Sequence, residues 1–420
     1  MKYLVIGCSS AGIHAMEAIR QKDATGEITC LTKEQDLPYG RPLISYWLEG
    51  KIREEKMSLR PQEFFDRLGI RLCTGVEAVR LDLANRSVLT ATGQSFTYDR
   101  LFLGCGGKPI VPPIEGLKAV PHFFFHTLAD VKKIKLLVTP EDKVLIIGGG
   151  LIGLKAAESL TSLNARVTVV DLAPHLLSSI MGAGAAYMVQ EAICAQGVEV
   201  KLNNSVAAVR MIGPRELAVT LKDGVQLMVN HLVVAVGVAP NLDLVQGTAL
   251  SHRRGLLVDQ HMQTNISGVY AGGDMVEFRE MLSGQQKVVG IVLNAAMQGR
   301  VAGYNMAGFP LAFDGSMVCN SLNLFATNIV TMGESTAAGE NKEILVSRPA
   351  PGVYRELVFR DGRLCGATLI NDAERAGILR HLIYKQVEVD EVKEGLLAKT
   401  PQLLEIPFAR WDEYYRDLTA

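Results

Sequence analysis

Two glycine-rich turns, one starting at Gly7 and one at Gly148, constrain the fold of this chain more than any other feature. Each turn follows a short, mostly apolar segment, residues 3–6 or 143–147, of the kind that forms a buried parallel strand. Each also leads into a helical pattern, so that the N–H groups and the dipole at a helix N-terminus face the turn, where a pyrophosphate can bind. The sequence therefore predicts an α/β protein with two Rossmann-like dinucleotide-binding domains.

The first turn departs from the G-x-G-x-x-G fingerprint at one position, because Ser9 stands where the second glycine is expected. Taken alone, this turn fits two interpretations equally well, a nucleotide site and an ordinary connection from a strand to a helix. A serine is tolerated there if its backbone still approaches the pyrophosphate. The residues expected to bind the first dinucleotide at this turn are Gly7, Ser9, Ser10, Ala11 and Gly12.

The second turn carries the complete fingerprint, and its expected binding residues are Gly148, Gly150, Leu151, Ile152 and Gly153. The next strand pattern, residues 166–170, ends at Asp171, where a carboxylate accepts hydrogen bonds from the ribose hydroxyls of the adenosine half. The same carboxylate would repel a 2′-phosphate, and residues 172–175 contain no arginine to neutralise one. We therefore expect NADH to be preferred to NADPH.

A third signal lies at residues 264–274, where a short strand pattern ends in Gly272, Gly273 and Asp274. By its pattern alone Asp274 could be a helix cap. Because the chain already has two dinucleotide starts, a role for Asp274 as a cofactor ligand is favoured.

Composition and cysteine spacing exclude several other classes of protein. Lys plus Arg number 43 and Asp plus Glu 44, so there is no excess of positive charge to bind a nucleic acid. The seven cysteines show no C-x-x-C spacing, which argues against zinc ribbons, cysteine-ligated iron–sulfur clusters and a local redox dithiol, and we expect no metal site. With no apolar run of ~18 residues and no signal-peptide pattern, we expect a cytoplasmic protein without a membrane span.

On these motifs the chain resembles the two-dinucleotide flavoproteins of the pyridine nucleotide–disulfide oxidoreductase superfamily. The most similar branch is that of the NADH-dependent rubredoxin and ferredoxin reductases and the flavin part of assimilatory nitrite reductases. The resemblance implies FAD in the first unit, NAD(P)H in the second, which Asp171 narrows to NADH, and a C-terminal α+β interface domain. The implied boundaries are residues 1–113 and 241–315 for the discontinuous FAD-binding domain, 114–240 for the NAD-binding domain and 316–420 for the interface domain.

The resemblance also implies further cofactor-binding positions. Residues 37–45 look like the segment that lies along the flavin, residues 233–241 like the strand that returns to the FAD domain, and residues 292–298 like the helix start beneath the flavin pyrimidine ring. The Asp274 motif would close on the ribityl chain of FAD. The positions concerned are Arg41, Pro42, Ala78, Gly106, Gly237, Gly273, Asp274, Val292, Ala295 and Asn320.

Departures from the family pattern concern the reacting centre. Thiol-using relatives carry a cysteine just before a Leu-Glu-Gly-Lys segment, but residues 41–47 contain none, which argues against a thiol mechanism. Ferredoxin reductases have a lysine and a glutamate where Tyr46 and Lys155 stand, so these two residues are the catalytic candidates. Two alternatives stay open for Lys155, an ammonium near the nicotinamide or flavin and an ordinary pairing with a nearby carboxylate. Lys33 occupies the position of the FAD-ribose acid, and Glu34 beside it is the candidate substitute.

The C-terminal part reads as short strands followed by helices. Asp361-Gly362 between residues 354–359 and 364–370 is a hairpin signal, and helical patterns follow at 373–384 and 389–397. Aromatic residues at 408–415 are spaced three to four apart, which favours one more helix.

Together these features predict an FAD-dependent NADH oxidoreductase that passes electrons to a redox protein. Rubredoxin, ferredoxin or an iron–sulfur subunit of a larger complex would serve as the partner, with the chain itself a homodimer or a subunit of a hetero-oligomer. One alternative is an NADH oxidase that forms hydrogen peroxide at the flavin. Another is a flavin-binding assembly subunit whose main role is interaction.

Overall fold

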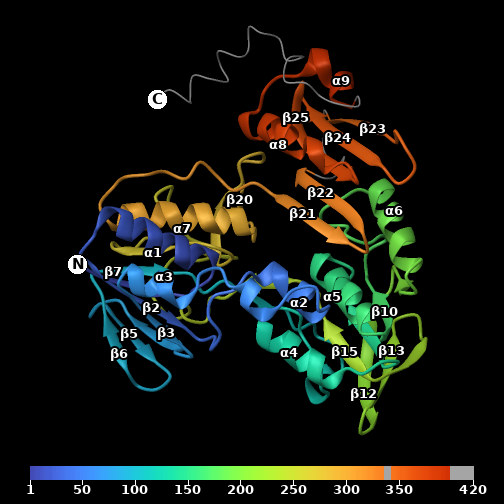
Figure 1. Ribbon diagram of the computed structural model, residues 1–420, viewed down its shortest axis with the longest axis horizontal. Coiled ribbons are helices and arrows are strands. Elements are labelled where there is room, and N and C mark those ends of the chain that lie inside the picture. Colours follow the sequence, from blue (N-terminus) through green and yellow to red (C-terminus); the bar gives the residue numbers. More distant parts are fainter. Residues whose placement is uncertain (335–341, 398–420) are drawn as a thin grey trace. The chain divides into compact units, whose positions relative to one another are not determined.

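The computed structural model describes residues 1–334 and 342–397 (Figure 1). The chain folds into two compact units. The first unit comprises Met1–Val111, His126–Leu137 and Gly237–Ser316. The second comprises Pro112–Phe125, Val138–Val236 and Met317–Ala420. The helical tail predicted at residues 408–415 lies outside the described residues.

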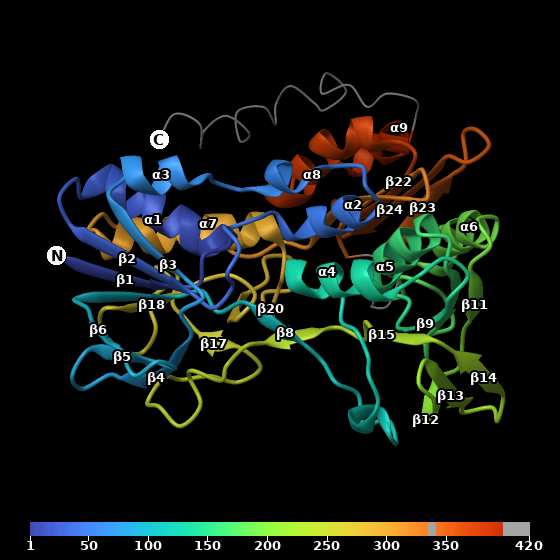
Figure 2. The same cartoon turned by 60° about the horizontal axis from the view of Figure 1, so that its bottom comes forward.

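The sheet of the first unit has five parallel strands in the order β3-β2-β1-β7-β18. Its strands are mostly apolar, because helices and smaller sheets cover the parallel strands. Helices α1 (Ser10–Lys22) and α7 (Val292–Met306) lie side by side on one face of it in both views (Figures 1 and 2). The strands are β1 (Lys2–Ile6), β2 (Glu27–Thr32), β3 (Ile70–Thr74), β7 (Arg100–Leu103) and β18 (Val269–Ala271).

The second unit contains a parallel sheet of the same kind, with four strands in the order β11-β10-β9-β15. In each sheet the strand order reverses beside the first strand, between β1 and β7 in one unit and between β9 and β15 in the other. Such a switch point, at the carboxyl ends of the strands, is where open α/β sheets bind their ligands. The strands are β9 (Lys143–Ile147), β10 (Arg166–Val170), β11 (Glu199–Lys201) and β15 (His231–Val234), with helices α5 (Leu151–Ser162) and α6 (Ala183–Cys194).

Smaller elements complete both units. The second unit adds the antiparallel strands β12 (Val206–Gly213), β13 (Glu216–Leu221) and β14 (Gln226–Val229). The first unit adds strands β4 (Ala78–Asp82), β5 (Ser87–Thr90), β6 (Ser95–Thr97), β8 (Gly107–Pro109), β16 (Val238–Pro240), β17 (Leu256–Leu257), β19 (Val276–Arg279) and β20 (Gln286–Val288), and helices α2 (Ile44–Leu48), α3 (Gln62–Arg67) and α4 (Leu128–Leu137).

Helix α4 falls in the range that was expected to be the NAD-binding domain, yet it packs within the first unit. The Lys132 ammonium pairs with Asp36 and Glu54, and the Lys135 ammonium lies 4.3 Å from the ring centroid of Trp47. These partners are far away in sequence, so no local pattern in residues 114–137 reports the contact.

The C-terminal part folds into an antiparallel sheet in the order β21-β22-β25-β24-β23, followed by helices. Its hairpin at Asp361 and Gly362 is confirmed, since both residues have the positive φ angles, 50° and 71°, that a tight two-residue turn requires. The elements are β21 (Cys319–Leu324), β22 (Thr327–Gly333), β23 (Lys342–Ser347), β24 (Tyr354–Arg360), β25 (Arg363–Ile370), α8 (Ala376–Lys385) and α9 (Lys393–Leu397).

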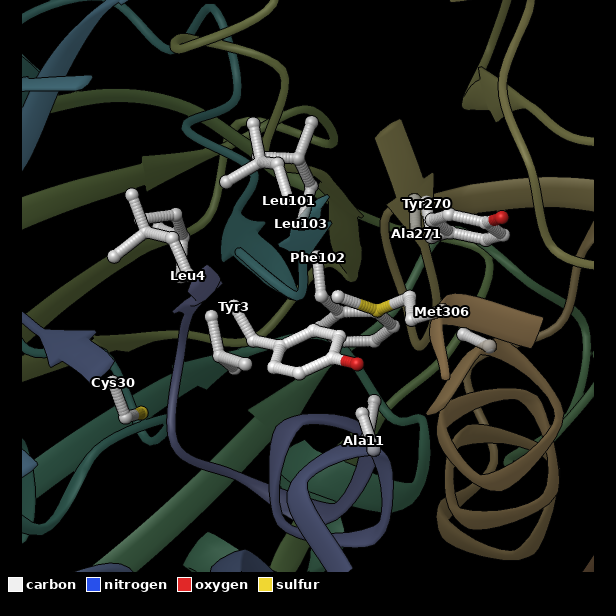
Figure 3. Close-up of a cluster of buried hydrophobic side chains, with 14 of the residues drawn as sticks. Tyr3, Leu4, Ala11, Cys30, Leu101, Phe102, Leu103, Tyr270, Ala271 and Met306 are labelled. Atoms are coloured by element: carbon white, nitrogen blue, oxygen red, sulfur yellow. The ribbon is translucent and has the colours of Figure 1, made fainter. Parts of the chain in front are cut away.

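The core of the first unit lies between its parallel sheet and the helices α1 and α7 (Figure 3). Phe102 on β7 is fully buried, with Leu101 and Leu103 as its buried neighbours on the strand. The two helices approach closely because α7 presents glycine to α1. A Cβ atom at Gly299 would lie 2.0 Å from the carbonyl oxygen of Ala11, and one at Gly303 would lie 2.3 Å from that of Ala15.

This close approach makes the first unit sensitive to one methyl group. We expect Gly299→Ala to push α7 away from α1 and to destabilise the first unit by ~1–3 kcal/mol, the usual cost of overpacking. Gly377→Ala on α8 is the matched control, because a Cβ there meets nothing within 4 Å and should be neutral or slightly stabilising. Thermal unfolding compares the two variants, and an unchanged midpoint for Gly299→Ala would show that the helices are not in close contact.

Two candidate dinucleotide sites

The first glycine turn packs backbone against backbone. Gly7 follows β1 with a φ of +97°, and a Cβ there would lie 2.2 Å from the carbonyl oxygen of Gly104 at the end of β7. A Cβ at Gly12 would lie 2.0 Å from the carbonyl oxygen of Gly7. Only glycine allows β1, β7 and the start of α1 to meet this closely, so the N-terminus of α1 is fixed at the switch point of the sheet.

The second turn repeats this arrangement. Gly148 follows β9 with a φ of +114°, and its Cβ would lie 2.4 Å from the carbonyl oxygen of Ala235, just after β15. A Cβ at Gly153 would lie 1.9 Å from the carbonyl oxygen of Gly148. Gly150, in contrast, faces open space, with no atom within 4 Å of its Cβ position. The turn therefore has its packed glycines on the inside and an open one on the side where a ligand would approach.

The N-termini of both helices are available to an anion. Ser9 and Gly150 stand at the N-cap positions of α1 and α5, and neither provides a side-chain capping bond to the first turn. The hydroxyl of Ser10 instead donates to the carbonyl oxygen of Val292, 3.3 Å away at the start of α7. The first turns of α1 and α5 thus fit a pyrophosphate group.

Asp274 lies just after β18, beside the first turn. A Cβ on the neighbouring Gly273 would be 3.4 Å from Ala11 and 3.8 Å from Ala295, so the Asp274 motif, α1 and the start of α7 meet at one place. Burial raises the pKa of the Asp274 carboxyl above its ordinary value of 3.8, although the Arg41 guanidinium opposes the shift. Among the described residues Asp274 has no hydrogen-bond donor. A half-buried acceptor without a donor fits the hydroxyl groups of a ribityl chain.

Arg41 is held in place by groups from two segments. Its guanidinium pairs with the carboxylate of Glu34 and donates to the carbonyl oxygen of His126 at 3.0 Å. The hydroxyl of Tyr39 donates to the other oxygen of Glu34 at 2.5 Å and accepts the N–H of Leu128 at 2.8 Å. Both oxygens of Glu34 therefore bind protein groups, and the proposed contact of Glu34 with the FAD ribose stays a prediction.

Asp171 closes the second turn. One oxygen of its carboxylate accepts the N–H of Gly149 at 2.5 Å, and the other accepts the N–H of Ala173 at 2.7 Å. This places a carboxylate, hydrogen-bonded by two N–H groups, directly beside the fingerprint. The arrangement fits the ribose hydroxyls of the adenosine half of NADH.

The two catalytic candidates belong to different units. Tyr46 lies on α2 of the first unit, with the Lys51 ammonium 5.8 Å from its ring centroid. In the second unit the Lys155 ammonium pairs with Glu158 and donates to the carbonyl oxygen of Asn323 at 3.2 Å. Of the two alternatives for Lys155, the structure contains the pairing with a nearby carboxylate. A cofactor contact of Tyr46 or Lys155 stays a prediction.

The other expected positions are spread over both units. Pro42 follows Arg41 in a 3₁₀ turn, Ala78 begins β4, Gly106 follows β7 with a φ of +67° and Gly237 precedes β16 with a φ of +120°. Asn320 lies in the second unit on β21, where its side chain donates to the Thr331 hydroxyl at 3.2 Å.

Lys33 follows β2, and its charge lowers the pKa of the Cys105 thiol, but burial dominates and raises that pKa to about 12. The Cys105 thiol is therefore protonated at neutral pH.

Several residues at the sites were missed from the sequence. His126 and Tyr39 support Arg41, and Glu158 binds Lys155, but none of them stands in a motif that names its partner. His126 ends the run of histidines and phenylalanines at residues 122–126, and nothing in that run indicates a contact with residue 41. In the structure the His126 ring bonds the carbonyl oxygen of Gly107 at 3.1 Å, and burial together with Arg41 lowers its pKa.

Within residues 1–334 and 342–397, no group of three or more His, Cys, Asp or Glu side chains is placed to hold a metal ion. The same residues include no helix whose length and apolar character would let it cross a membrane.

Replacing Asp274 should have opposite effects on two quantities, the stability of the FAD-free protein and its affinity for FAD. In the FAD-free protein the pKa of Asp274 is raised, so ionisation of this carboxyl lowers the free energy of unfolding. This loss of stability is absent at pH values below the pKa of Asp274 in the unfolded chain. It develops as the pH rises through the pKa of Asp274 in the folded chain. Asp274→Asn should therefore raise the FAD-free unfolding temperature at pH 7.5 but not at pH 3.5. It should also weaken FAD binding by roughly 10-fold or more, because a hydrogen bond to a charged acceptor is lost.

Asp23→Asn is the control for this experiment. The N–H groups of Gly26 and Thr25 lower the pKa of Asp23, so replacing this carboxylate should destabilise the fold at pH 7.5. Thermal unfolding at both pH values and FAD titration by flavin fluorescence measure the effects. Equal FAD affinity in Asp274→Asn would remove Asp274 from the flavin site.

The family of the chain follows from comparison with known proteins. The model of the family "pyridine nucleotide-disulphide oxidoreductase" matches residues 1–299, and that of the "rubredoxin NAD+ reductase C-terminal domain" matches residues 319–387. The NADH-dependent phenylglyoxylate dehydrogenase subunit epsilon of Aromatoleum evansii is 31% identical over 402 residues, which cover 94% of each chain. The rubredoxin-NAD(+) reductase of Pseudomonas putida is 26% identical and covers 73% of this chain and 80% of that protein.

Among solved structures, the covalent putidaredoxin reductase–putidaredoxin complex has a chain with the same fold. It superposes with a TM-score of 0.88 at 23% identity, over 97% of this chain and 98% of that one. The α/β fold class with two Rossmann-like domains, the class of NADH-dependent oxidoreductases and the cofactors FAD and NADH are thereby confirmed. The chain belongs to the pyridine nucleotide-disulphide oxidoreductase family.

Proposed function

We propose that the chain oxidises NADH and passes the electrons through FAD to an acidic redox protein, namely rubredoxin, ferredoxin or an iron–sulfur subunit of a larger complex. Bound FAD supplies the redox chemistry, because a flavin accepts two electrons from NADH and releases them one at a time. The names of the relatives support this type of partner, since they include a rubredoxin reductase and a dehydrogenase subunit. The contribution of this chain is binding, orientation and charge.

In the first unit, the N-terminus of α1 would hold the FAD pyrophosphate, with Arg41 as a second positive group. Asp274 would accept hydrogen bonds from the ribityl hydroxyls. Helix α7, with fifteen residues, presents its N-terminus at Val292, where the positive end of the helix dipole stabilises negative charge. In the second unit, the N-terminus of α5 would hold the NADH pyrophosphate and Asp171 the adenosine ribose.

Direct electron transfer is favoured over thiol chemistry. No cysteine occurs in residues 41–47, where thiol-using relatives carry one beside the flavin. Cys105, which follows β7 near the first turn, is kept protonated at neutral pH by its burial. A protonated thiol is a poor nucleophile. The acceptor is therefore expected to take electrons without a disulfide of this chain as an intermediate carrier.

The observation that carries the proposal is an exposed stripe along α7. Leu293, Met297, Arg300 and Tyr304 follow one another at intervals of three or four residues, and the first two are 54% and 43% exposed. The stripe begins at the helix end that is assigned to the flavin. A mixed apolar and charged helix face at this place fits a protein acceptor better than a small molecule.

The charge at the far end of the stripe supports an acidic acceptor. Arg300 and Lys22 both lie 5.5 Å from the ring centroid of Tyr304, and Lys22 also lies 4.7 Å from that of Phe309. Neither cation has an ion-pair partner within the described part of the chain. Two unpaired cations on an exposed face attract an acidic partner and steer its approach.

The function is tested by offering one acceptor at a time to the FAD-loaded chain. We expect NADH to bleach the flavin without oxygen, and a rubredoxin or a [2Fe–2S] ferredoxin to restore its colour in repeated turnovers. Turnover with oxygen alone would instead show an oxidase that forms hydrogen peroxide. If NADH did not bleach the flavin, the result would favour the alternative that the chain is a flavin-binding assembly subunit.

The stripe on α7 gives a second prediction. Arg300→Glu should lower kcat/KM for a rubredoxin or ferredoxin by roughly 10-fold at low salt, with a smaller loss at high salt, because electrostatic steering is screened by ions. The rate with ferricyanide should not change. Lys118→Glu makes the same charge change at an exposed site of the second unit and should leave both rates unaltered. Equal losses with both acceptors in Arg300→Glu would contradict a docking role.

Asp171 gives the prediction for the nucleotide. The unmodified enzyme should use NADH far better than NADPH, because the carboxylate repels a 2′-phosphate. Asp171→Ala should raise KM for NADH and bring the two cofactors closer together, while the FAD content stays the same. Steady-state rates with both cofactors measure the ratio. Equal efficiency in the unmodified enzyme would refute the role of Asp171.

The proposed location is the cytoplasm, and the proposed assembly is a homodimer or a subunit of a hetero-oligomer. All seven cysteines are free, which fits a reducing compartment. Cell fractionation and light scattering of the purified chain test the two proposals.

A further inference from the structure

The turn between β21 and β22 holds two neighbouring residues in a conformation that their side chains disfavour. Phe325 and Ala326 have φ angles of +46° and +63°, and they form the two-residue connection after Leu324, which pairs with Thr327. A turn of this kind is normally built with Asn and Gly, because other side chains are strained at positive φ. A strained turn persists only where its surroundings hold it in place.

Glu158 on α5 holds this turn. One oxygen of its carboxylate accepts the N–H of Phe325 at 2.9 Å, and the other pairs with the ammonium of Lys155. Lys155 in turn donates to the carbonyl oxygen of Asn323 at 3.2 Å. The side chain of Glu158 is only 9% exposed. A carboxylate this buried requires a partner charge and hydrogen bonds, and both are present.

The same helix connects the turn to the candidate NADH site. Helix α5 begins at Leu151, directly after the second glycine turn, and Glu158 lies two helical turns further along. Strand β21 carries Asn320, three residues before Asn323. The fingerprint, α5 and the hairpin of residues 319–333 are therefore joined by one short series of covalent and hydrogen bonds within the second unit.

We propose that Glu158 is a positioning residue that couples dinucleotide binding at the start of α5 to the order of the hairpin 319–333, with Lys155 as its counter-ion. A ligand that fixes the N-terminus of α5 also fixes the acceptor of the Phe325 N–H, and by linkage an ordered hairpin favours the ligand. This inference rests on the proposed NADH site. It assigns to Lys155 a structural partner in place of the nicotinamide or flavin.

The test is hydrogen exchange of the FAD-loaded full chain with and without saturating NAD⁺. In the unmodified chain, NAD⁺ should slow exchange of the amides in residues 321–328 by ~5-fold or more, the lower end of usual coupling strengths. In Glu158→Gln, which breaks the ion pair with Lys155 and leaves only a weaker, less firmly held amide acceptor for the Phe325 N–H, this slowing should disappear although NAD⁺ still binds. The exposed Glu141, which pairs with Arg166, provides the control, and Glu141→Gln should behave like the unmodified chain.

Two double variants separate positioning from a general loss of stability. Adding Ala326→Gly to Glu158→Gln relieves the strained turn and should restore part of the order of the hairpin without NAD⁺. Exchanging the charges as Lys155→Glu with Glu158→Lys keeps an ion pair but removes the acceptor for the Phe325 N–H, so the effect of NAD⁺ should stay lost. Restored coupling in the exchanged variant, or an unchanged effect of NAD⁺ in Glu158→Gln, would overturn the inference. Failure of the unmodified chain to bind NAD⁺ would instead overturn the proposed NADH site.

Discussion

In both candidate sites, the first turn of a helix packs directly against the carbonyl oxygen of the glycine that follows the preceding strand. The rest of each site depends on this contact. Gly12 against Gly7, and Gly153 against Gly148, leave no room for a side chain. This contact sets the angle at which α1 and α5 leave their sheets, and therefore where their N–H groups point. The remaining site residues act at places that these two contacts define. The same backbone geometry thus occurs in both candidate dinucleotide sites.

Carboxylates near the sites differ in whether protein groups already donate hydrogen bonds to them or pair with their charge. Glu34 and Glu158 are satisfied by protein groups, a guanidinium, a hydroxyl, an ammonium or an N–H. Asp274 is half-buried without such a donor, and desolvation makes its charge unfavourable in the absence of a ligand. Asp171 lies between these cases, because two N–H groups orient it while its remaining lone pairs can accept from a ribose. The donors present around a carboxylate therefore indicate whether it serves the fold or the cofactor.

Features that depend on short-range patterns could be predicted from the sequence. The two glycine turns, the acid after β10 and the Asp361-Gly362 hairpin each lie within a segment whose residues fix the local backbone. Contacts between distant segments could not be obtained in this way. The placement of α4 depends on Asp36, Glu54 and Trp47, and the partners of Lys155 include a carbonyl 168 residues away. The pairing of Lys155 is settled by packing, which no single segment of the sequence reports.

The order of the parallel strands in the first unit has a consequence for synthesis on the ribosome. Its central strands β1 and β2 and helix α1 emerge first, but β18, Asp274 and α7 lie beyond the entire parallel sheet of the second unit. Chains fold largely in the order in which they emerge. The nascent first unit therefore exposes the free edge of β7 and the uncovered side of α1 while residues 143–234 are being made. The second parallel sheet can form before the first, and the first unit becomes complete only when α7 has left the exit tunnel.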